Sequence, residues 1–115
     1  YTVSLGDDGK SLRAMGSGLD GLVLAGFGAG HVPASMVPAL AELAARIPVL
    51  LASRTGGGAI FADTYGSPGS ERDLLARGLI GAGLLDPYKA RILLTLLLRT
   101  GADRELITAT IAAFG

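Results

Sequence analysis

The sequence predicts an α/β fold in which a small parallel sheet carries helices on both faces. Apolar runs of strand length alternate with segments whose apolar residues recur every three or four positions, a pattern typical of parallel sheets with crossover helices. The run Gly21–Gly26 is apolar throughout and has glycine at both ends, as expected of a strand buried on both faces. With 115 residues, half of them apolar, the chain is long enough for one domain with a single core.

The first half of the chain contains three strand-like segments separated by helical ones. We expect strands over Tyr1–Leu5, Gly21–Gly26 and Ile47–Ala52, and one or two helical turns over Lys10–Met15. A longer helix should begin at Ser35, a good N-cap residue, with Pro38 in its first turn. Its apolar face comprises Met36, Leu40, Leu43 and Ile47.

The second half is predicted to close the sheet with helices. Ala59–Pro68 is less regular, and Ser70–Asp73 resembles a capping box that opens a short helix. Gly78–Gly83 is a candidate edge strand. Asp86 followed by Pro87 is typical of a helix start, and this helix should continue through Leu98 and end at Gly101. Asp103 caps a last helix, with an expected buried face of Leu106, Ile107, Ile111 and Phe114.

Composition excludes several classes of function. Ten basic and ten acidic residues cancel without forming a basic stripe, and aromatic residues are few, so a nucleic-acid interface is not indicated. The chain has no cysteine and one histidine, which excludes a thiol nucleophile and a zinc site of several cysteines or histidines. The longest apolar runs, Leu19–Phe27 and Ile92–Leu98, are far shorter than the roughly 20 residues that span a bilayer.

The chain begins at Tyr1 rather than methionine, and its first residues are already strand-like. We therefore expect it to be part of a longer protein whose targeting segments, if any, lie upstream.

A glycine-rich loop, Gly26–Pro33, follows the second strand and contains the only histidine, His31. A dinucleotide-binding loop requires a glycine where His31 stands and an acidic residue about 20 positions further on. The nearest acidic residue downstream, Glu42, lies inside a predicted helix. Two interpretations remain: a tight corner between strand and helix, or a turn facing a ligand, since loops at the carboxyl ends of parallel strands line the ligand crevice. In the second case, His31 and backbone N–H groups would meet an anionic group.

Three further polar features need an explanation. Ser53–Gly58 follows the next buried strand and should border the same edge of the sheet, where Arg54 is a candidate for an ion pair with Glu71 or Asp73. Asp86–Arg91 is explained by helix capping and a solvated face. Glu71 is the least explained charge: it would bind an ammonium group or interact with the dipole of the helix that it opens.

Taken together, four groups of segments resemble the C-terminal domain of the bacterial L-asparaginase family of asparaginase/glutaminase amidohydrolases. They occur in the family's order with matching gaps and cover nearly the whole chain. The groups are Gly26–Pro33; Ile47–Val49 with Ser53–Gly58; Thr64–Gly66 with Gly69–Glu71; and Gly78–Leu79 with Leu85–Arg91.

The resemblance implies a small Rossmann-like domain with a four-stranded parallel sheet flanked by helices. It also implies an active site between the large N-terminal domain of one subunit, which holds the nucleophilic threonine, and the small domain of a neighbour. A family glutamate that contacts the substrate stands eighteen residues before the lysine of a Lys-Ala-Arg motif, and Glu71 stands eighteen before Lys89.

The glycine-rich loop departs from the family pattern. Many members carry Gly-Asn-Gly-Asn, and Ala29 and His31 occupy the two asparagine positions here. The expected substrate-binding residues are therefore Glu71, on the α-ammonium group, with His31, Gly30 and Ala29 from the loop. No catalytic residue of the family falls within this chain, and no metal or cofactor is implied.

For the whole protein the resemblance implies an L-asparaginase, a cytoplasmic homodimer or homotetramer that converts L-asparagine to L-aspartate and ammonia. Residues 1–115 would be its C-terminal α/β domain, inactive without the N-terminal catalytic domain. The expected partners are that domain, further subunits and the amino-acid substrate, with no nucleic acid or membrane. Two alternatives stay open: a non-catalytic α/β module that binds a small ligand, and a subunit of an amidotransferase acting on misacylated tRNA, which shares this domain family.

Overall fold

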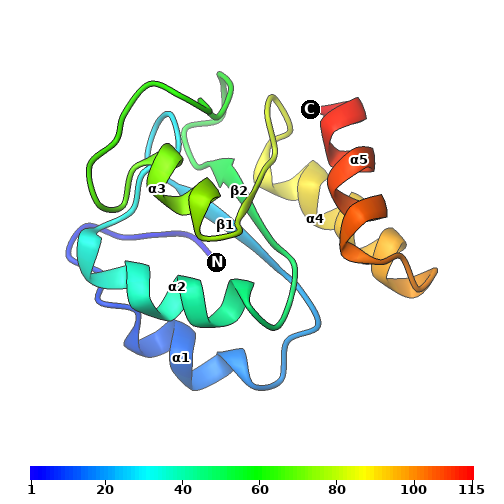
Figure 1. The fold of residues 1–115 in the computed structure, drawn as a ribbon, viewed down its shortest axis with the longest axis horizontal. Coiled ribbons are helices and arrows are strands. Elements are labelled where there is room, and N and C mark those ends of the chain that lie inside the picture. Colours follow the sequence, from blue (N-terminus) through cyan, green and yellow to red (C-terminus); the bar gives the residue numbers. More distant parts are fainter.

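The computed structural model describes residues 1–115 and contains a parallel sheet with helices on both faces (Figure 1). The strands are β1 (Leu22–Gly26), β2 (Val49–Ser53) and β3 (Ile80–Gly81), which lie in that order in the sheet. The register pairs each residue of β1 with one of β2, from Leu22 opposite Val49 to Gly26 opposite Ser53. The predicted α/β class is confirmed.

The sheet has three strands rather than the four expected. The first residues lie beside β1 where a fourth strand would be, but they form only one parallel bridge, between Thr2 and Ala25, and one further bond from the Tyr1 amino group to the Val23 carbonyl. The chain then turns away, because the Asp7 carboxylate accepts hydrogen bonds from the Tyr1 hydroxyl, at 2.6 Å, and from the Gly9 N–H, at 2.9 Å. These bonds stabilise the Gly6–Gly9 turn and keep Ser4 and Leu5 out of the sheet.

Two helical layers enclose the sheet (Figure 1). One layer comprises α1 (Lys10–Gly16), the 3-10 turn η1 (Ala34–Met36), α2 (Val37–Ala44) and α3 (Glu71–Ala76). The other comprises α4 (Pro87–Arg99) and α5 (Arg104–Phe114). None of these helices combines the length and apolar character that crossing a membrane requires.

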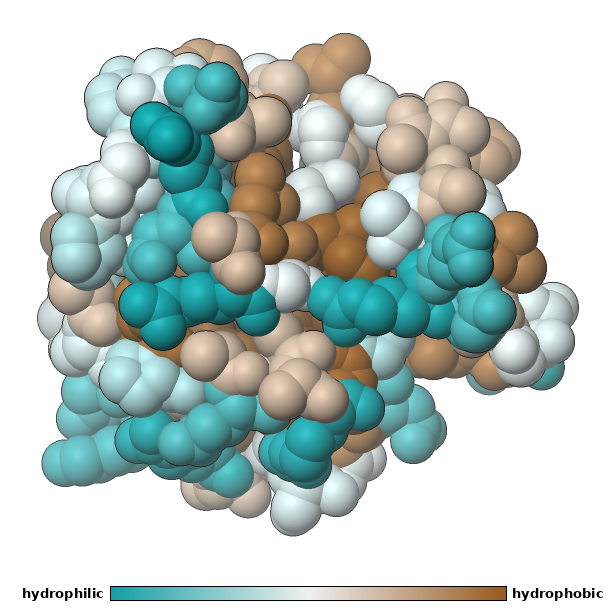
Figure 2. All heavy atoms as spheres, in the orientation of Figure 1, coloured by the Kyte–Doolittle hydropathy of each residue, from teal (hydrophilic) through white to brown (hydrophobic).

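Side chains alternate along the strands and so divide the core between the two layers. Leu24 and Leu51 pack with α1, α2 and α3, whereas Leu50 packs with α4 and α5. In Figure 2 the apolar residues gather in the middle of the view, between the layers, and polar side chains dominate over α1. The sheet therefore separates two cores, one under each helical layer, and together they fix the positions of the loops at the strand ends.

The predicted helix ends are partly confirmed. Asp86 and Asp103 cap α4 and α5, since their side chains accept from the N–H groups of Lys89 and Leu106, each at 2.9 Å. The expected cap at Ser35 is wrong: Ser35 lies within η1, and its hydroxyl donates instead to the Asp7 carbonyl at 2.8 Å.

Two further expectations about helices are corrected. Ser70 precedes α3, but its hydroxyl makes no capping bond there and donates to the Tyr65 carbonyl at 2.9 Å. In α5, Ile107 and Ile111 are buried as predicted, while Leu106 and Phe114 are more than half exposed. A single layer of helix over the sheet buries only a narrow stripe of positions four residues apart.

The central strand should dominate the stability of the domain. Leu51 is fully buried in β2, so Leu51→Ala should lower the free energy of unfolding by about 2–5 kcal/mol through lost burial and a residual cavity. Leu84→Ala is the matched control, because Leu84 is 69% exposed and should change the free energy by less than about 0.5 kcal/mol. Urea denaturation of the wild type and the two variants measures their free energies of unfolding. Equal midpoints for Leu51→Ala and Leu84→Ala would contradict the assignment of Leu51 to the core.

Candidate functional site

The loops that follow β1 and β2 meet at the carboxyl edge of the sheet. Three backbone hydrogen bonds join them: the Arg54 N–H donates to the Gly26 carbonyl at 2.8 Å, the Phe61 N–H to the Ala29 carbonyl at 2.9 Å, and the Val32 N–H to the Gly69 carbonyl at 2.9 Å. Both loops lie at the upper end of the sheet in Figure 1. They therefore form one continuous surface around the start of α3.

The glycine-rich loop is a tight turn that closes on itself. Phe27 and His31 exchange backbone hydrogen bonds of 2.8 and 3.0 Å, and Gly28 and Gly30 between them have φ angles of +45° and +118°. At Gly30 a Cβ atom would lie 3.2 Å from side-chain atoms of Glu71, Ile60 and Leu51. Gly30 thus provides both the unusual backbone angle and the space in which Glu71 packs.

Glu71 is the first residue of α3, and no part of it is exposed to solvent. Its Oε1 accepts hydrogen bonds from the backbone N–H groups of Thr64, at 2.8 Å, and Tyr65, at 2.6 Å. Its Oε2 is buried and has no hydrogen-bond partner. The carboxylate is therefore half satisfied, which is rare for a buried charged group.

The pKa of Glu71 reflects two opposing influences. Burial raises the pKa of this carboxyl, but the N–H groups of Tyr65, Thr64 and Glu71 itself, together with the charge of His31, outweigh burial and hold the pKa below its usual value. Glu71 therefore carries a negative charge at neutral pH, although water does not reach it.

His31 is the side chain that faces the unsatisfied oxygen. Its Nε2 lies 4.0 Å from Glu71 Oε2, too far for a hydrogen bond, and its side chain is 32% exposed. The edge of its ring packs against Tyr65, with the ring centroids 5.1 Å apart and the planes at 67°. We call Glu71, His31 and Tyr65 the Glu71 cluster.

The structure thus brings together three of the four predicted site residues. Glu71, His31 and Gly30 are in direct proximity, whereas Ala29 contributes only its carbonyl, which binds the Phe61 N–H. The ion pair of Arg54 with Glu71 or Asp73 is wrong. Instead, the Arg54 guanidinium lies 4.5 Å from the centroid of the Phe27 ring and donates to the Val3 carbonyl at 3.0 Å.

The two remaining polar segments lie next to each other and away from Glu71. Residues of Ser53–Gly58 and of the start of α4, including Asp86 and Lys89, line a small hollow of about 190 Å³. On the Ser53–Gly58 loop the Ser53 and Thr55 hydroxyls are hydrogen-bonded at 2.8 Å, and the Thr55 hydroxyl also donates to the Gly57 carbonyl at 2.8 Å. The Ser53 and Thr55 hydroxyls therefore stabilise the conformation of the loop.

The backbone donors of Thr64 and Tyr65 are functional groups that the sequence reasoning missed. Thr64–Gly66 was identified only as a matching segment. The one available signal was distance along the chain, because a segment six or seven residues before a helix-starting glutamate can fold back onto it.

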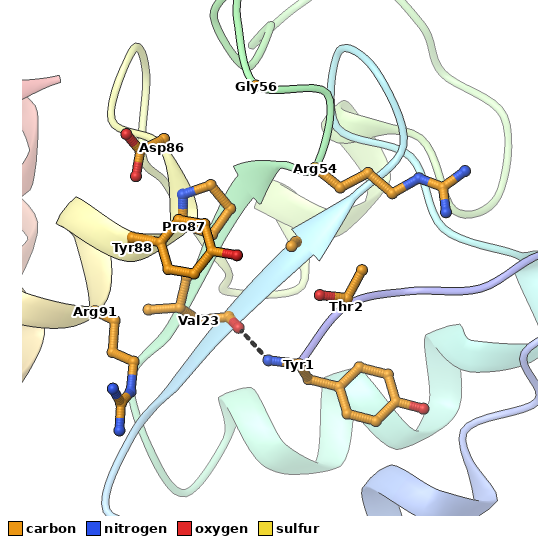
Figure 3. Close-up of a pocket in the computed structure, with 10 residues that line it drawn as sticks. Tyr1, Thr2, Val23, Arg54, Gly56, Asp86, Pro87, Tyr88 and Arg91 are labelled. Atoms are coloured by element: carbon orange, nitrogen blue, oxygen red, sulfur yellow. Dashed lines mark hydrogen bonds between the residues drawn. The ribbon is translucent and has the colours of Figure 1, made fainter.

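A separate hollow lies beside the amino-terminal segment and β1 (Figure 3). It measures about 430 Å³, and its wall includes Thr2, Val23, Tyr88 and Arg91. Neither Glu71 nor His31 lines any of the five main hollows of the domain. The Glu71 cluster thus combines a buried carboxylate with two partly exposed rings and lines none of these hollows.

No group of three or more histidine, cysteine, aspartate or glutamate side chains is arranged to hold a metal ion. The chemistry available in the Glu71 cluster is that of one ionised carboxylate, one imidazole, one phenol and backbone amides.

Comparison with known proteins identifies the family. A family model, the glutaminase/asparaginase C-terminal domain, matches residues 1–111. The chain is 44% identical over 86 residues to a probable L-asparaginase of Deinococcus radiodurans, and 34% identical over 96 residues to an L-asparaginase of Bacillus licheniformis. These matches include 75% and 82% of this chain but only 26% and 30% of the relatives.

The fold leads to the same family. The thermostable L-asparaginase from Thermococcus kodakarensis superposes with a TM-score of 0.86 and 26% sequence identity, over 96% of this chain and 34% of that one. The chain therefore corresponds to about a third or less of the length of these relatives. It belongs to the glutaminase/asparaginase family and matches the family's C-terminal domain.

Proposed function

We propose that the protein containing this domain is an L-asparaginase, which hydrolyses L-asparagine to L-aspartate and ammonia, and that Glu71 binds the α-ammonium group of the substrate. The observation that carries the proposal is the buried Glu71 carboxylate, ionised, with one oxygen held by two N–H groups and the other without a partner. Such an oxygen is suited to a cationic donor.

An amino-acid ammonium group supplies what Glu71 Oε2 lacks. An ionised carboxylate only accepts hydrogen bonds, and an ammonium group only donates them. A charge-assisted bond between the two is stronger than one between neutral groups, and Glu71 Oε2 is itself shielded from water. Oε1 is already occupied by Thr64 and Tyr65, so the carboxylate is held in one orientation while Oε2 accepts the ligand.

The resemblance to the family implies that the catalytic residues themselves lie in an N-terminal domain. A threonine hydroxyl there would add to the side-chain amide carbon, and its proton would pass to the amide nitrogen, so that the C–N bond breaks and ammonia leaves. Water would then hydrolyse the resulting ester to L-aspartate and free the threonine. The C-terminal domain described above would position the α-ammonium end of the substrate. Its loop over 61–68 is exposed throughout, including Phe61 and Tyr65, which suits a surface that another domain covers.

We further propose that the covering domain comes from a neighbouring subunit of a homo-oligomer, so that each active site is shared between two chains. A domain that supplies only the substrate contacts is then inactive by itself.

Glu71→Gln tests the carboxylate directly. The amide oxygen of glutamine can still accept from Thr64 and Tyr65, but its NH₂ group replaces Oε2 and cannot bind an ammonium group. Loss of a bond between charged groups corresponds to about 1.5–3 kcal/mol, so kcat/KM of the full-length enzyme should fall by about ten- to a hundredfold. Glu42→Gln removes an exposed carboxylate on α2 that pairs with Arg13 and should leave kcat/KM unchanged. Steady-state ammonia release measures both variants, and equal values for the two would remove Glu71 from the site.

Gly30→Ala tests the packing of the loop against Glu71. Alanine at this position combines a strained φ with a close contact to the Glu71 side chain, so KM should rise and the free energy of unfolding should fall by about 1–3 kcal/mol. Gly28→Ala has a positive φ as well, but nothing lies within 4 Å of its added Cβ. It therefore separates backbone strain from displacement of Glu71. If the two variants raise KM equally, the close contact has no role in binding.

The 115-residue chain alone should release no ammonia from L-asparagine, because it lacks the proposed nucleophile. Incubating the purified chain with substrate and a coupled ammonia assay measures this. The full-length enzyme at the same molar concentration is the positive control. Turnover by the chain alone would place the nucleophile within residues 1–115 and contradict the division of labour.

A further inference from the structure

We propose that His31 competes with the substrate's ammonium group for Glu71 Oε2, so that protonation of His31 closes the binding site. This inference rests on the proposed function and adds a dependence on the charge state of one residue. It makes His31 a competitor at the site and not only a wall of it.

The geometry places His31 over the oxygen that the ligand must reach. Glu71 Oε2 is buried and has no hydrogen-bond partner. The His31 Nε2 atom, which carries a positive charge when the ring is protonated, lies 4.0 Å from it. A ring rotation that shortens this distance by about 1 Å would bring the pair to hydrogen-bond length. The His31 side chain is 32% exposed, so a ligand can displace the ring toward solvent without disturbing the core.

No other charged side chain around the cluster competes for Oε2. On the loop after β2, Arg54 stacks on Phe27, and Asp63 pairs with Arg72 at 3.1 Å. On α3, Asp73 pairs with Arg77 at 2.9 Å. The other titratable group that touches His31 is Tyr65, through the edge-to-face contact of their rings. The balance at Oε2 is therefore between His31 and an incoming cation.

The charge of His31 decides that balance. Histidine is the side chain whose charge ordinarily changes between pH 5 and 8. A protonated imidazole donates a charge-assisted hydrogen bond to Oε2 and occupies the position of the ammonium group. A neutral imidazole makes no ion pair, so the ammonium group displaces it. Binding should therefore weaken as the pH falls, while Glu71 itself stays ionised because its pKa lies below the usual value.

The test is the pH dependence of KM for L-asparagine in the full-length enzyme between pH 5.5 and 8. In the wild type KM should rise as the pH falls, toward a limit of about tenfold per pH unit for one linked proton. In His31→Asn, which has a hydrogen-bonding side chain but no titratable group, this low-pH rise should disappear. Arg72→Gln removes an exposed cation of α3 near the cluster and should retain the wild-type profile.

A ligand without the amino group provides a second readout. L-aspartate carries an ammonium group, and succinate is the same molecule without it. Above about pH 6.5, where both carboxyl groups of succinate are mostly ionised, inhibition by L-aspartate should weaken with falling pH in the wild type and not in His31→Asn, while inhibition by succinate should not weaken in either. Equal weakening of both inhibitors would overturn the proposal, because competition at Oε2 would not be the cause.

The outcomes separate this inference from the proposed function. If Glu71→Gln raises KM but wild type and His31→Asn share one pH profile, Glu71 binds the substrate and the competition by His31 is wrong. If Glu71→Gln leaves KM unchanged, the proposed role of Glu71 is wrong and the competition falls with it. An enzyme that does not hydrolyse L-asparagine overturns both.

Discussion

A negative charge without access to water organises the carboxyl edge of this sheet. Glu71 is held there by two backbone N–H groups of an exposed loop, and the packing around it requires glycine at position 30. The loop is in turn fixed by Ser70, whose hydroxyl binds the Tyr65 carbonyl. The loops after β1 and β2 and the start of α3 thus share one constraint: together they must compensate a single buried carboxylate.

That compensation is incomplete, and the proposed function rests on the oxygen that it leaves without a partner. A buried polar atom without a partner destabilises the folded chain by about 1–3 kcal/mol, and Glu71 Oε2 is such an atom. A cation bound at Oε2 would recover that free energy. Departures from local consistency of this kind are expected where a protein binds something. The proposed ammonium ligand and the proposed competition by His31 are two ways of satisfying the same oxygen.

Most of the fold could be predicted from the sequence, because it depends on patterns that residue types record. The alternating segments predicted the layers, and aspartates before two helices predicted their starts at Pro87 and Arg104. Ser35 and Ser70 misled, since tertiary acceptors, the carbonyls of Asp7 and Tyr65, bind their hydroxyls instead. The expected fourth strand does not form, also because of a tertiary hydrogen bond that the sequence pattern does not reveal. The Asp7 carboxylate stabilises a turn that directs the chain out of the sheet after Val3.

The residue types at positions 64 and 65 do not predict the donors to Glu71, because every residue except proline has a backbone N–H; only their distance along the chain from Glu71 carries a signal. The same fact has an evolutionary consequence. Side chains along 61–68 can be exchanged without removing the hydrogen bonds that Thr64 and Tyr65 make through their backbone, provided that the loop keeps its path. Selection can therefore alter the size, charge and polarity of this exposed surface while the buried carboxylate and its two hydrogen bonds stay in place.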